Sequence, residues 1–310
     1  MQDRIAIIDL GTNTFHLLIA TWDKTGLHVV HRERVAVKIG KGGINQDLIQ
    51  NEAVSRAVEA LKKFKLKIDQ LTVPTIYAFG TSALRNAKNA KEVIQAIKQA
   101  TNIEVQIISG EQEAEFIYLG VRSAFDLGDH TSLIIDIGGG SVEFIIGNKT
   151  EIFWKKSIEI GAQRLLEEFQ KHDPITQEEI TNLDAYFTTS LSELHTALNM
   201  YHPTTLVGSS GTFDTLSDMY CVENNIQKGE NDSETPFSIQ SFYPIYKDLI
   251  TKTRSERMLM PGMIEMRVDM IVVACCLIRY LLDHSNFQNI RVSSYALKEG
   301  VLASVLKTKP

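Results

Sequence analysis

The sequence carries one short pattern twice, and this repeat constrains the fold more than any other feature. Residues 7–14 read IIDLGTNT and residues 134–141 read IIDIGGGS, so Asp136 stands 127 positions after Asp9. In both copies an apolar strand ends in an aspartate, a glycine-containing turn with a small polar residue follows, and a second apolar strand begins. The repeat predicts two domains of one design, each opening on a β-hairpin.

Both turns have the composition of a phosphate-binding loop. Glycine lets the backbone approach an anion closely, and successive N–H groups of such a turn form a nest for phosphate oxygens. Hydroxyl side chains add further donors. We therefore predict phosphate contacts from Gly11, Thr12 and Asn13 in the first copy and from Gly138, Gly139, Gly140 and Ser141 in the second.

The two aspartates predict a metal ion. Asp9 and Asp136 each end the first strand of a copy, where they would face the bound anion and repel it unless a cation such as Mg²⁺ lies between. One Asp-Gly hairpin would be weak support, because such turns also occur for conformational reasons. Two copies at equivalent places predict a polyphosphate held in a cleft between the domains, with Mg²⁺ as cofactor.

A third segment, GSSGT at residues 208–212, follows a predicted strand and precedes a predicted helix at 213–220. The N–H groups and dipole of a helix N-terminus favour anions, although serine and glycine also begin helices that bind nothing. Beside the two repeated turns, this segment adds four predicted phosphate contacts, which are Ser209, Ser210, Gly211 and Thr212.

The length and the order of the elements predict two α/β domains. A chain of 310 residues exceeds the roughly 100–200 residues of one domain. Three strand-like runs open the chain, after which helical and strand periodicities alternate, and a second strand series begins at residue 132. We predict one domain at 1–126 and a second at 127–295, with the final helix at 296–310 joined to the first domain. Within the second domain we expect one helix at 177–199 and an exposed loop at 223–234.

The composition excludes several classes of protein. A net charge of −6 argues against a surface built for duplex nucleic acid. Cys221, Cys275 and Cys276 do not make a disulfide framework or a zinc motif, which fits a reducing cytoplasm. The apolar run at 270–278 is far shorter than the roughly 20 residues that span a bilayer, and no export signal is visible. We expect a cytoplasmic protein without nucleic-acid or membrane partners.

Six segments in order resemble one known family, and together they span nearly the whole chain. They are IDLGTNTFH at 8–16, GTSALRNA at 80–87, ISGEQEA at 108–114, DIGGGSVE at 136–143, GSSGT at 208–212 and ALKEGV at 296–301. These segments resemble the exopolyphosphatase and guanosine pentaphosphatase (Ppx/GppA) family, within the superfamily of actin and the sugar kinases. The resemblance implies two duplicated ribonuclease H-like (actin-like ATPase) domains with an interdomain phosphate-binding cleft, and a Mg²⁺-dependent hydrolase that removes a terminal phosphate from a phosphoanhydride.

The resemblance also implies roles for three side chains that the pattern alone does not distinguish. Glu113 matches the family's catalytic carboxylate, which orients and deprotonates the attacking water; on its own it reads as a surface residue in a first helical turn. Glu143 matches a second acidic site residue that orders water or metal beside Asp136. Arg85 matches a phosphate-contacting arginine, whose rigid fork suits bidentate binding of an anion.

Two departures from the family pattern leave the substrate open. First, Lys298 stands where the family usually has arginine. Second, the resemblance does not include the helical C-terminal domain of the long members. Because of this second departure, we expect a preference for short polyphosphate chains or nucleotides. Inorganic polyphosphate and guanosine pentaphosphate both remain candidate substrates. An ATP-dependent phosphotransferase and a non-catalytic alarmone or polyphosphate sensor are the alternatives. Homodimers occur in the family, but no feature of the sequence locates an interface.

Overall fold

The chain forms two compact units, Met1–Glu113 and Ala114–Pro310. The computed structural model describes residues 4–23, 26–229 and 232–307. The division between the units falls inside helix α4 (Gly110–Ala124). The domain limits expected from the sequence, with a boundary after residue 126 and the final helix joined to the first domain, stay a prediction.

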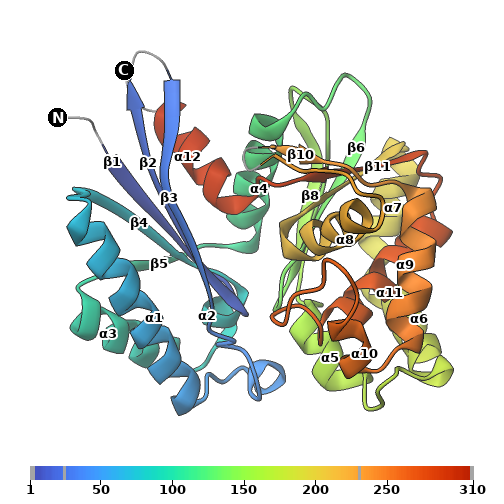
Figure 1. The fold of residues 1–310 in the computed structure, drawn as a ribbon, viewed down its shortest axis with the longest axis horizontal. Coiled ribbons are helices and arrows are strands. Elements are labelled where there is room, and N and C mark those ends of the chain that lie inside the picture. The colour runs from blue at the N-terminus through green and yellow to red at the C-terminus, as the bar shows by residue number, and fades with distance from the viewer. Residues whose placement is uncertain (1–3, 24–25, 230–231, 308–310) are drawn as a thin grey trace. The chain divides into compact units, whose positions relative to one another are not determined.

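The first unit is built on a five-stranded mixed sheet. Its strands are β1 (Arg4–Leu10), β2 (Thr14–Asp23), β3 (Gly26–Ala36), β4 (Thr75–Gly80) and β5 (Val105–Ile107), in the spatial order β3-β2-β1-β4-β5. Strands β1 to β3 form an antiparallel meander, whereas β4 and β5 continue the sheet in parallel with β1 (Figure 1). Because Leu10 pairs with Gly80, the first glycine turn follows β1 at the same sheet edge where β4 ends.

Helices of the first unit cover the sheet through amphipathic faces. They are α1 (Asn51–Gln70), α2 (Ser82–Asn86) and α3 (Ala90–Thr101), with a 3₁₀ turn at Ile44–Gln46. In α1 the residues Ala57, Leu61 and Phe64 repeat at helical spacing and pack in one buried cluster with Ile8 and Leu17 of the sheet. The sequence did not predict α2, since five residues are too few to show a helical period.

The second unit repeats the same design with a six-stranded sheet. Its strands are β6 (Ser132–Ile137), β7 (Val142–Gly147), β8 (Ile152–Ile158), β9 (Thr205–Ser209), β10 (Glu234–Thr235) and β11 (Asn289–Ser293), in the order β10-β11-β9-β6-β7-β8. Apart from the added strand β10, the order β8-β7-β6-β9-β11 matches that of the first unit strand for strand. The predicted α/β fold of two duplicated domains is therefore confirmed.

Several helices belong to the second unit, and most of them contribute to its core. They are α5 (Ala162–Phe169), α6 (Gln177–Ser190), α7 (Ser192–Tyr201), α8 (Ser210–Glu223), α9 (Ile239–Thr251), α10 (Arg254–Met258), α11 (Ile271–Asp283) and α12 (Leu297–Lys307). Helix α11 carries the apolar run that the sequence placed inside the protein, and its residues 271–278 are all buried. Among the described residues, no helix combines the length and the apolarity needed to cross a membrane.

The helix predicted at 177–199 is interrupted, which corrects the sequence prediction. Helix α6 ends at Ser190 and α7 begins at Ser192, with the fully buried Leu191 between them. Phe187 before the break and Leu194 after it belong to the same core. The buried positions 180, 183, 187, 191, 194 and 198 keep helical spacing across the break, so the sequence pattern shows no sign of it.

A capping box begins α6 and centres on a carboxylate that several backbone groups bind. Glu179 Oε2 accepts a hydrogen bond from Thr176 N at 2.8 Å, and its Oε1 accepts bonds from Lys171 N at 2.6 Å and His172 N at 3.0 Å. Burial by itself would raise the pKa of Glu179, but the backbone donors outweigh it and lower the pKa to about 2. The ionised carboxylate thus fixes the segment between α5 and α6.

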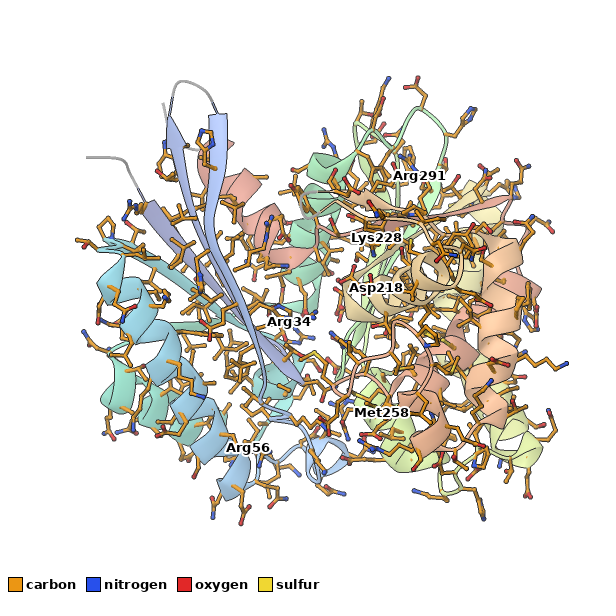
Figure 2. The ribbon with its side chains drawn as sticks, viewed as in Figure 1. Arg34, Arg56, Asp218, Lys228, Met258 and Arg291 are labelled. Carbon is orange, nitrogen blue, oxygen red and sulfur yellow. The ribbon has the colours of Figure 1, made fainter. Side chains whose placement is uncertain are left out.

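The stretch from 223 to 234, predicted to be an exposed loop, is largely irregular, and one of its residues contacts the preceding helix α8. Lys228 Nζ donates a hydrogen bond to Asp218 Oδ1 of α8 at 2.6 Å (Figure 2). The short strand β10 begins at Glu234. Residues 230 and 231 of the predicted loop lie outside the described residues.

Candidate active site

The first glycine turn is held in place through its carbonyl groups. Gly40 N donates to Thr12 O at 3.1 Å, and Lys38 N donates to Asn13 O at 2.8 Å. The C=O and N–H groups of one trans peptide point in opposite directions, so the N–H groups of Asn13 and Thr14 face away from this segment. Thr12 and Asn13 are both buried. The carbonyl side of the turn is thus bonded to the segment at 38–40, and the N–H side is turned away from it.

Arg85 lies next to this turn in the first unit. Its helix, α2, starts after Thr81, whose N and Oγ1 both donate to Leu10 O at the end of β1, at 3.5 and 3.4 Å. The N–H of Arg85 donates to Thr81 O at 2.8 Å. These bonds fix α2 beside the last residue of β1, directly before Gly11.

The guanidinium of Arg85 binds the carboxylate of Glu113. Nη1 donates to Glu113 Oε2 at 2.8 Å and also to Ile108 O at 3.3 Å. Only 16% of the Arg85 side chain and 9% of the Glu113 side chain are exposed. Glu113 sits in the first turn of α4, where its N–H donates to Ser109 O at 2.9 Å. A largely buried carboxylate that a guanidinium fixes in one orientation is well placed to act as a base.

The second glycine turn repeats the arrangement of the first. Its three carbonyls accept hydrogen bonds from the start of α5: Ala162 N donates to Gly138 O at 2.9 Å, Gln163 N to Gly139 O at 2.9 Å and Gly161 N to Gly140 O at 3.1 Å. By the same peptide geometry, the N–H groups of residues 139–141 point away from α5. In both units, therefore, neighbouring backbone occupies the carbonyl side of the turn and leaves the N–H side to face elsewhere.

Two carboxylates of the second unit lie opposite each other on neighbouring strands. Asp136 of β6 pairs in register with Glu143 of β7, which puts both side chains on one face of the sheet. Glu143 Oε1 accepts hydrogen bonds from Ser141 Oγ and Ser157 Oγ, each at 2.7 Å. Both carboxylates are buried, with 7% of Asp136 and 1% of Glu143 exposed. The pair is thus desolvated and surrounded by hydroxyl donors.

The predicted third segment binds Asp136 directly. Asp136 Oδ2 accepts hydrogen bonds from Ser210 Oγ at 2.5 Å and from Ser209 Oγ at 3.1 Å. Burial raises the pKa of Asp136, and these two hydroxyls with the charges of Lys298 and Arg267 offset part of the rise. Ser209 ends β9 and Ser210 opens α8 with a φ of +67°, a conformation that non-glycine residues adopt at a cost in free energy.

The tertiary structure brings two basic residues, Arg267 and Lys298, close to this cluster. A Cβ atom added to Gly211 would lie 1.9 Å from Arg267 Nη2, so the Arg267 guanidinium packs directly on the first turn of α8. The charges of Lys298 and Arg267 both lower the pKa of Asp136 and that of Asp214, although burial is the larger effect and leaves the pKa of Asp214 at about 6. Arg267 was not singled out from the sequence, because no local pattern at 259–270 connects it to a glycine turn.

The predicted site residues therefore gather in two groups. Arg85 and Glu113 meet in the first unit, where α2 is fixed beside the first glycine turn. In the second unit, Asp136 meets Ser209 and Ser210, and Glu143 lies across the strand pair from it. Gly211 and Thr212, expected in a loop before a helix, belong to the first turn of α8 itself.

The residues of the second group fit the chemistry of a Mg²⁺ site. Mg²⁺ prefers oxygen ligands and is usually held by one or two carboxylates together with water and substrate phosphates, not by an all-protein cage. Asp136 and Glu143 supply two buried carboxylates on one face of the sheet. Within the described part of the chain, no three acidic, histidine or cysteine side chains are grouped as a metal site, which is compatible with an ion shared with the substrate.

The fold and these groups together define a class. Two α/β units have the same strand order, and each carries an aspartate followed by a glycine turn at the end of its first strand. This duplicated arrangement is that of the actin-like two-domain fold.

The chain belongs to the Ppx/GppA phosphatase family, whose model matches residues 18–309. The crystal structure of an exopolyphosphatase from Cytophaga hutchinsonii is 45% identical, with a TM-score of 0.96 over 99% of both chains. The Aquifex aeolicus member of the Ppx/GppA family is 26% identical, with a TM-score of 0.79 over 99% of both chains. A guanosine-5'-triphosphate,3'-diphosphate pyrophosphatase of Pseudoalteromonas translucida is 28% identical over 307 residues, which cover 97% of this chain and 59% of that protein.

Proposed function

We propose that this protein is an exopolyphosphatase that hydrolyses the terminal phosphate of inorganic polyphosphate with a carboxylate-activated water and Mg²⁺. The observation that carries the proposal is the part-buried hydrogen bond of 2.8 Å between Arg85 Nη1 and Glu113 Oε2, in the unit where Thr81 connects α2 to the end of β1. The name and the likeness of the Cytophaga structure support the choice of substrate. The three cysteines, all buried and without disulfides, support a cytoplasmic location.

Glu113 is the general base of the proposed reaction. Its carboxylate accepts a proton from water while the water oxygen attacks the terminal phosphorus, and the bond from phosphorus to the bridging oxygen breaks. The products are orthophosphate and a polyphosphate shortened by one unit. Arg85, bound to one carboxylate oxygen, orients Glu113 and places a positive charge beside the base.

Each unit supplies groups that suit phosphate oxygens. In the first unit these are the N–H groups of Asn13 and Thr14, and in the second they are the N–H groups of residues 139–141, the first turn of α8 and Arg267. Asp136 and Glu143 would hold Mg²⁺, which when bound neutralises charge on the phosphate oxygens. Ser209 and Ser210 keep the Asp136 carboxylate in one orientation for this purpose.

Hydrolysis of guanosine pentaphosphate is the second candidate function. The Pseudoalteromonas relative carries the corresponding name, and it matches 97% of this chain. The same turns, base and metal carboxylates would serve either substrate, because both end in a phosphoanhydride. The two substrates differ in the part of the molecule beyond the terminal phosphates, and the kcat/KM values for the two distinguish the candidate functions.

The test is a phosphate-release panel with the full-length chain. Long polyphosphate, tripolyphosphate, guanosine pentaphosphate and ATP are compared at equal concentration of phosphoanhydride, each with Mg²⁺ and with EDTA. We expect the highest kcat/KM on polyphosphate and no release with EDTA. A higher kcat/KM on guanosine pentaphosphate than on polyphosphate would favour the second candidate function over the first. Turnover of ATP alone, or tight binding of all four without release, would overturn both.

A further inference from the structure

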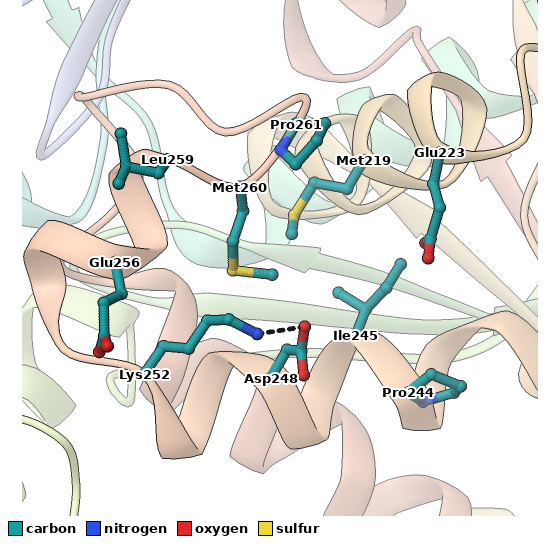
Figure 3. Close-up of a pocket in the computed structure, with 10 residues that line it drawn as sticks. All are labelled: Met219, Glu223, Pro244, Ile245, Asp248, Lys252, Glu256, Leu259, Met260 and Pro261. Atoms are coloured by element: carbon teal, nitrogen blue, oxygen red, sulfur yellow. Dashed lines mark ion pairs between the residues drawn. The ribbon is translucent and has the colours of Figure 1, made fainter.

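A cavity in the second unit lies apart from every residue assigned to phosphate or metal. Its volume is about 650 Å³, within the range of known small-molecule sites. It opens between α8, α9, α10 and the segment that follows α10 (Figure 3). The proposed chemistry uses none of the residues that line it.

The walls of the cavity are apolar and adaptable. Met219 of α8 and Met260 after α10 project their thioethers into it from one side, and Ile245 of α9 faces them from the other (Figure 3). Methionine side chains are flexible and polarisable, so they adjust to ligands of different shape. Pro244, Leu259 and Pro261 add further apolar groups to the lining. The cavity can therefore take an apolar body.

The charged residues that line the cavity are mostly acidic. They comprise three carboxylates, those of Glu223, Asp248 and Glu256, and one ammonium, that of Lys252. Lys252, the residue that follows α9, forms an ion pair with Asp248 of that helix, so its charge is already matched. Glu223 is exposed at the end of α8 and its carboxylate points toward the cavity (Figure 3). The lining thus attracts cations and repels anions.

We propose that this cavity binds a small organic cation with an apolar body, such as a primary amine on a hydrocarbon chain, and that the bound cation modulates the phosphate site. The hydrocarbon packs between the two methionines and Ile245, and the ammonium faces Glu223. An anion of the same shape meets like charge, and a neutral molecule gains only the apolar contact.

The segment at 259–267 connects the cavity to the phosphate-binding turn of α8. Gly262 has a φ of +83°, and a Cβ atom there would lie 2.6 Å from Met219 N, so the segment packs tightly on α8 beside the cavity. Five residues later, Arg267 packs on Gly211. A ligand that displaces Met260 therefore pushes on the segment that positions Arg267. This coupling rests on the proposed function, whereas the binding of the cation does not.

The binding is tested by calorimetric titration of the full-length chain with hexylamine, hexan-1-ol and hexanoate. We expect saturable binding of hexylamine about five- to tenfold tighter than hexan-1-ol, from one favourable charge contact, and no binding of hexanoate. Glu223→Lys should abolish the preference for the amine. Glu168→Lys is the matched control, because Glu168 is also an exposed glutamate in the last turn of a helix of this unit. Equal affinities for the three compounds, no saturation, or the same loss in Glu168→Lys would overturn the site.

The coupling is tested by phosphate release from polyphosphate with and without saturating hexylamine. We expect the amine to change kcat/KM of the parent protein at least about twofold, as coupled sites do, and to have no such effect on Glu223→Lys. That variant also corrects for pairing of the amine with polyphosphate in solution. An equal effect on both proteins, or none on either, would disprove the coupling. Absence of any phosphate release would instead refute the proposed function. The cation site would then be tested by the calorimetric titration alone.

Discussion

Arg85 and Glu113 lie 28 positions apart in the sequence, and Nη1 of the arginine donates a hydrogen bond to Oε2 of the glutamate at 2.8 Å. Both side chains are largely buried. A buried arginine–carboxylate pair can be purely structural, and the same geometry can position a base. Substitutions that keep the shape and change the chemistry distinguish these roles.

Glu113→Gln tests the base. The amide keeps the size and one acceptor oxygen but cannot take up a proton, so kcat should fall by roughly 10²- to 10⁴-fold with a small change in KM. The measurement is steady-state phosphate release from polyphosphate. Glu111→Gln is the control, because Glu111 occupies the same helical turn and is exposed. Unchanged kcat in Glu113→Gln would show that another group activates the water.

Arg85→Lys tests the fork. Lysine keeps the positive charge, but a single ammonium cannot bind Glu113, the Ile108 carbonyl and a phosphate with the fixed geometry of a guanidinium. We expect kcat/KM to drop about 10- to 100-fold. Arg32→Lys, at an exposed position of β3, should behave like the parent protein. A wild-type kcat/KM for Arg85→Lys would reduce the role of Arg85 to simple charge.

Asp136→Asn tests the metal carboxylates. Removing one of two buried carboxylates should raise the Mg²⁺ concentration for half-maximal phosphate release by about tenfold or more, while saturating Mg²⁺ restores part of the rate. Asp129→Asn, which changes an exposed aspartate of the same unit, should leave the Mg²⁺ dependence as it is. If Asp136→Asn alters the rate without altering the Mg²⁺ dependence, Asp136 does not hold the metal.

Asp214→Asn should stabilise the protein at neutral pH. Burial raises the pKa of Asp214 to about 6, above its value in the unfolded chain, so the stability that this group contributes is complete at low pH. It is lost as the pH rises from about 4 through about 6. The variant should gain on the order of 2 kcal/mol in the free energy of unfolding at pH 7.5 and little at pH 4.5. Urea unfolding at the two pH values measures this; a gain that is the same at both contradicts it.

Glu179→Gln should have the opposite pH dependence. The pKa of Glu179 is lowered to about 2, so its contribution is complete above about pH 4.5 and is lost as the pH falls toward 2. Loss of the charged acceptor of several backbone N–H groups should cost about 2 kcal/mol at pH 7, measured by urea unfolding. Glu178→Gln, one position earlier and exposed, provides the comparison. An equal cost in both variants would point to the helix dipole and not to the capping box.

Local chemistry made much of the fold predictable. Alternating apolar residues and glycine turns are recognisable over a few positions of the sequence. For this reason residues 7–14 and 134–141 predicted two equivalent strands, and β1 and β6 do occupy the same position in the strand order of their sheets. The same local reading overlooked α2, which is too short to show a period, and joined α6 to α7 across Leu191, where the apolar spacing continues without interruption.

The sequence by itself determined the duplication, the two glycine turns and the family, because each depends on residues that are neighbours along the chain. Only the tertiary structure decided which charged groups meet. Glu113 in a first helical turn is ordinary until α2 brings Arg85 to it, and Arg267 has no local connection to Gly211 until the segment after α10 crosses α8. Such contacts depend on how helices pack on the sheets, and no short pattern of residues encodes that packing.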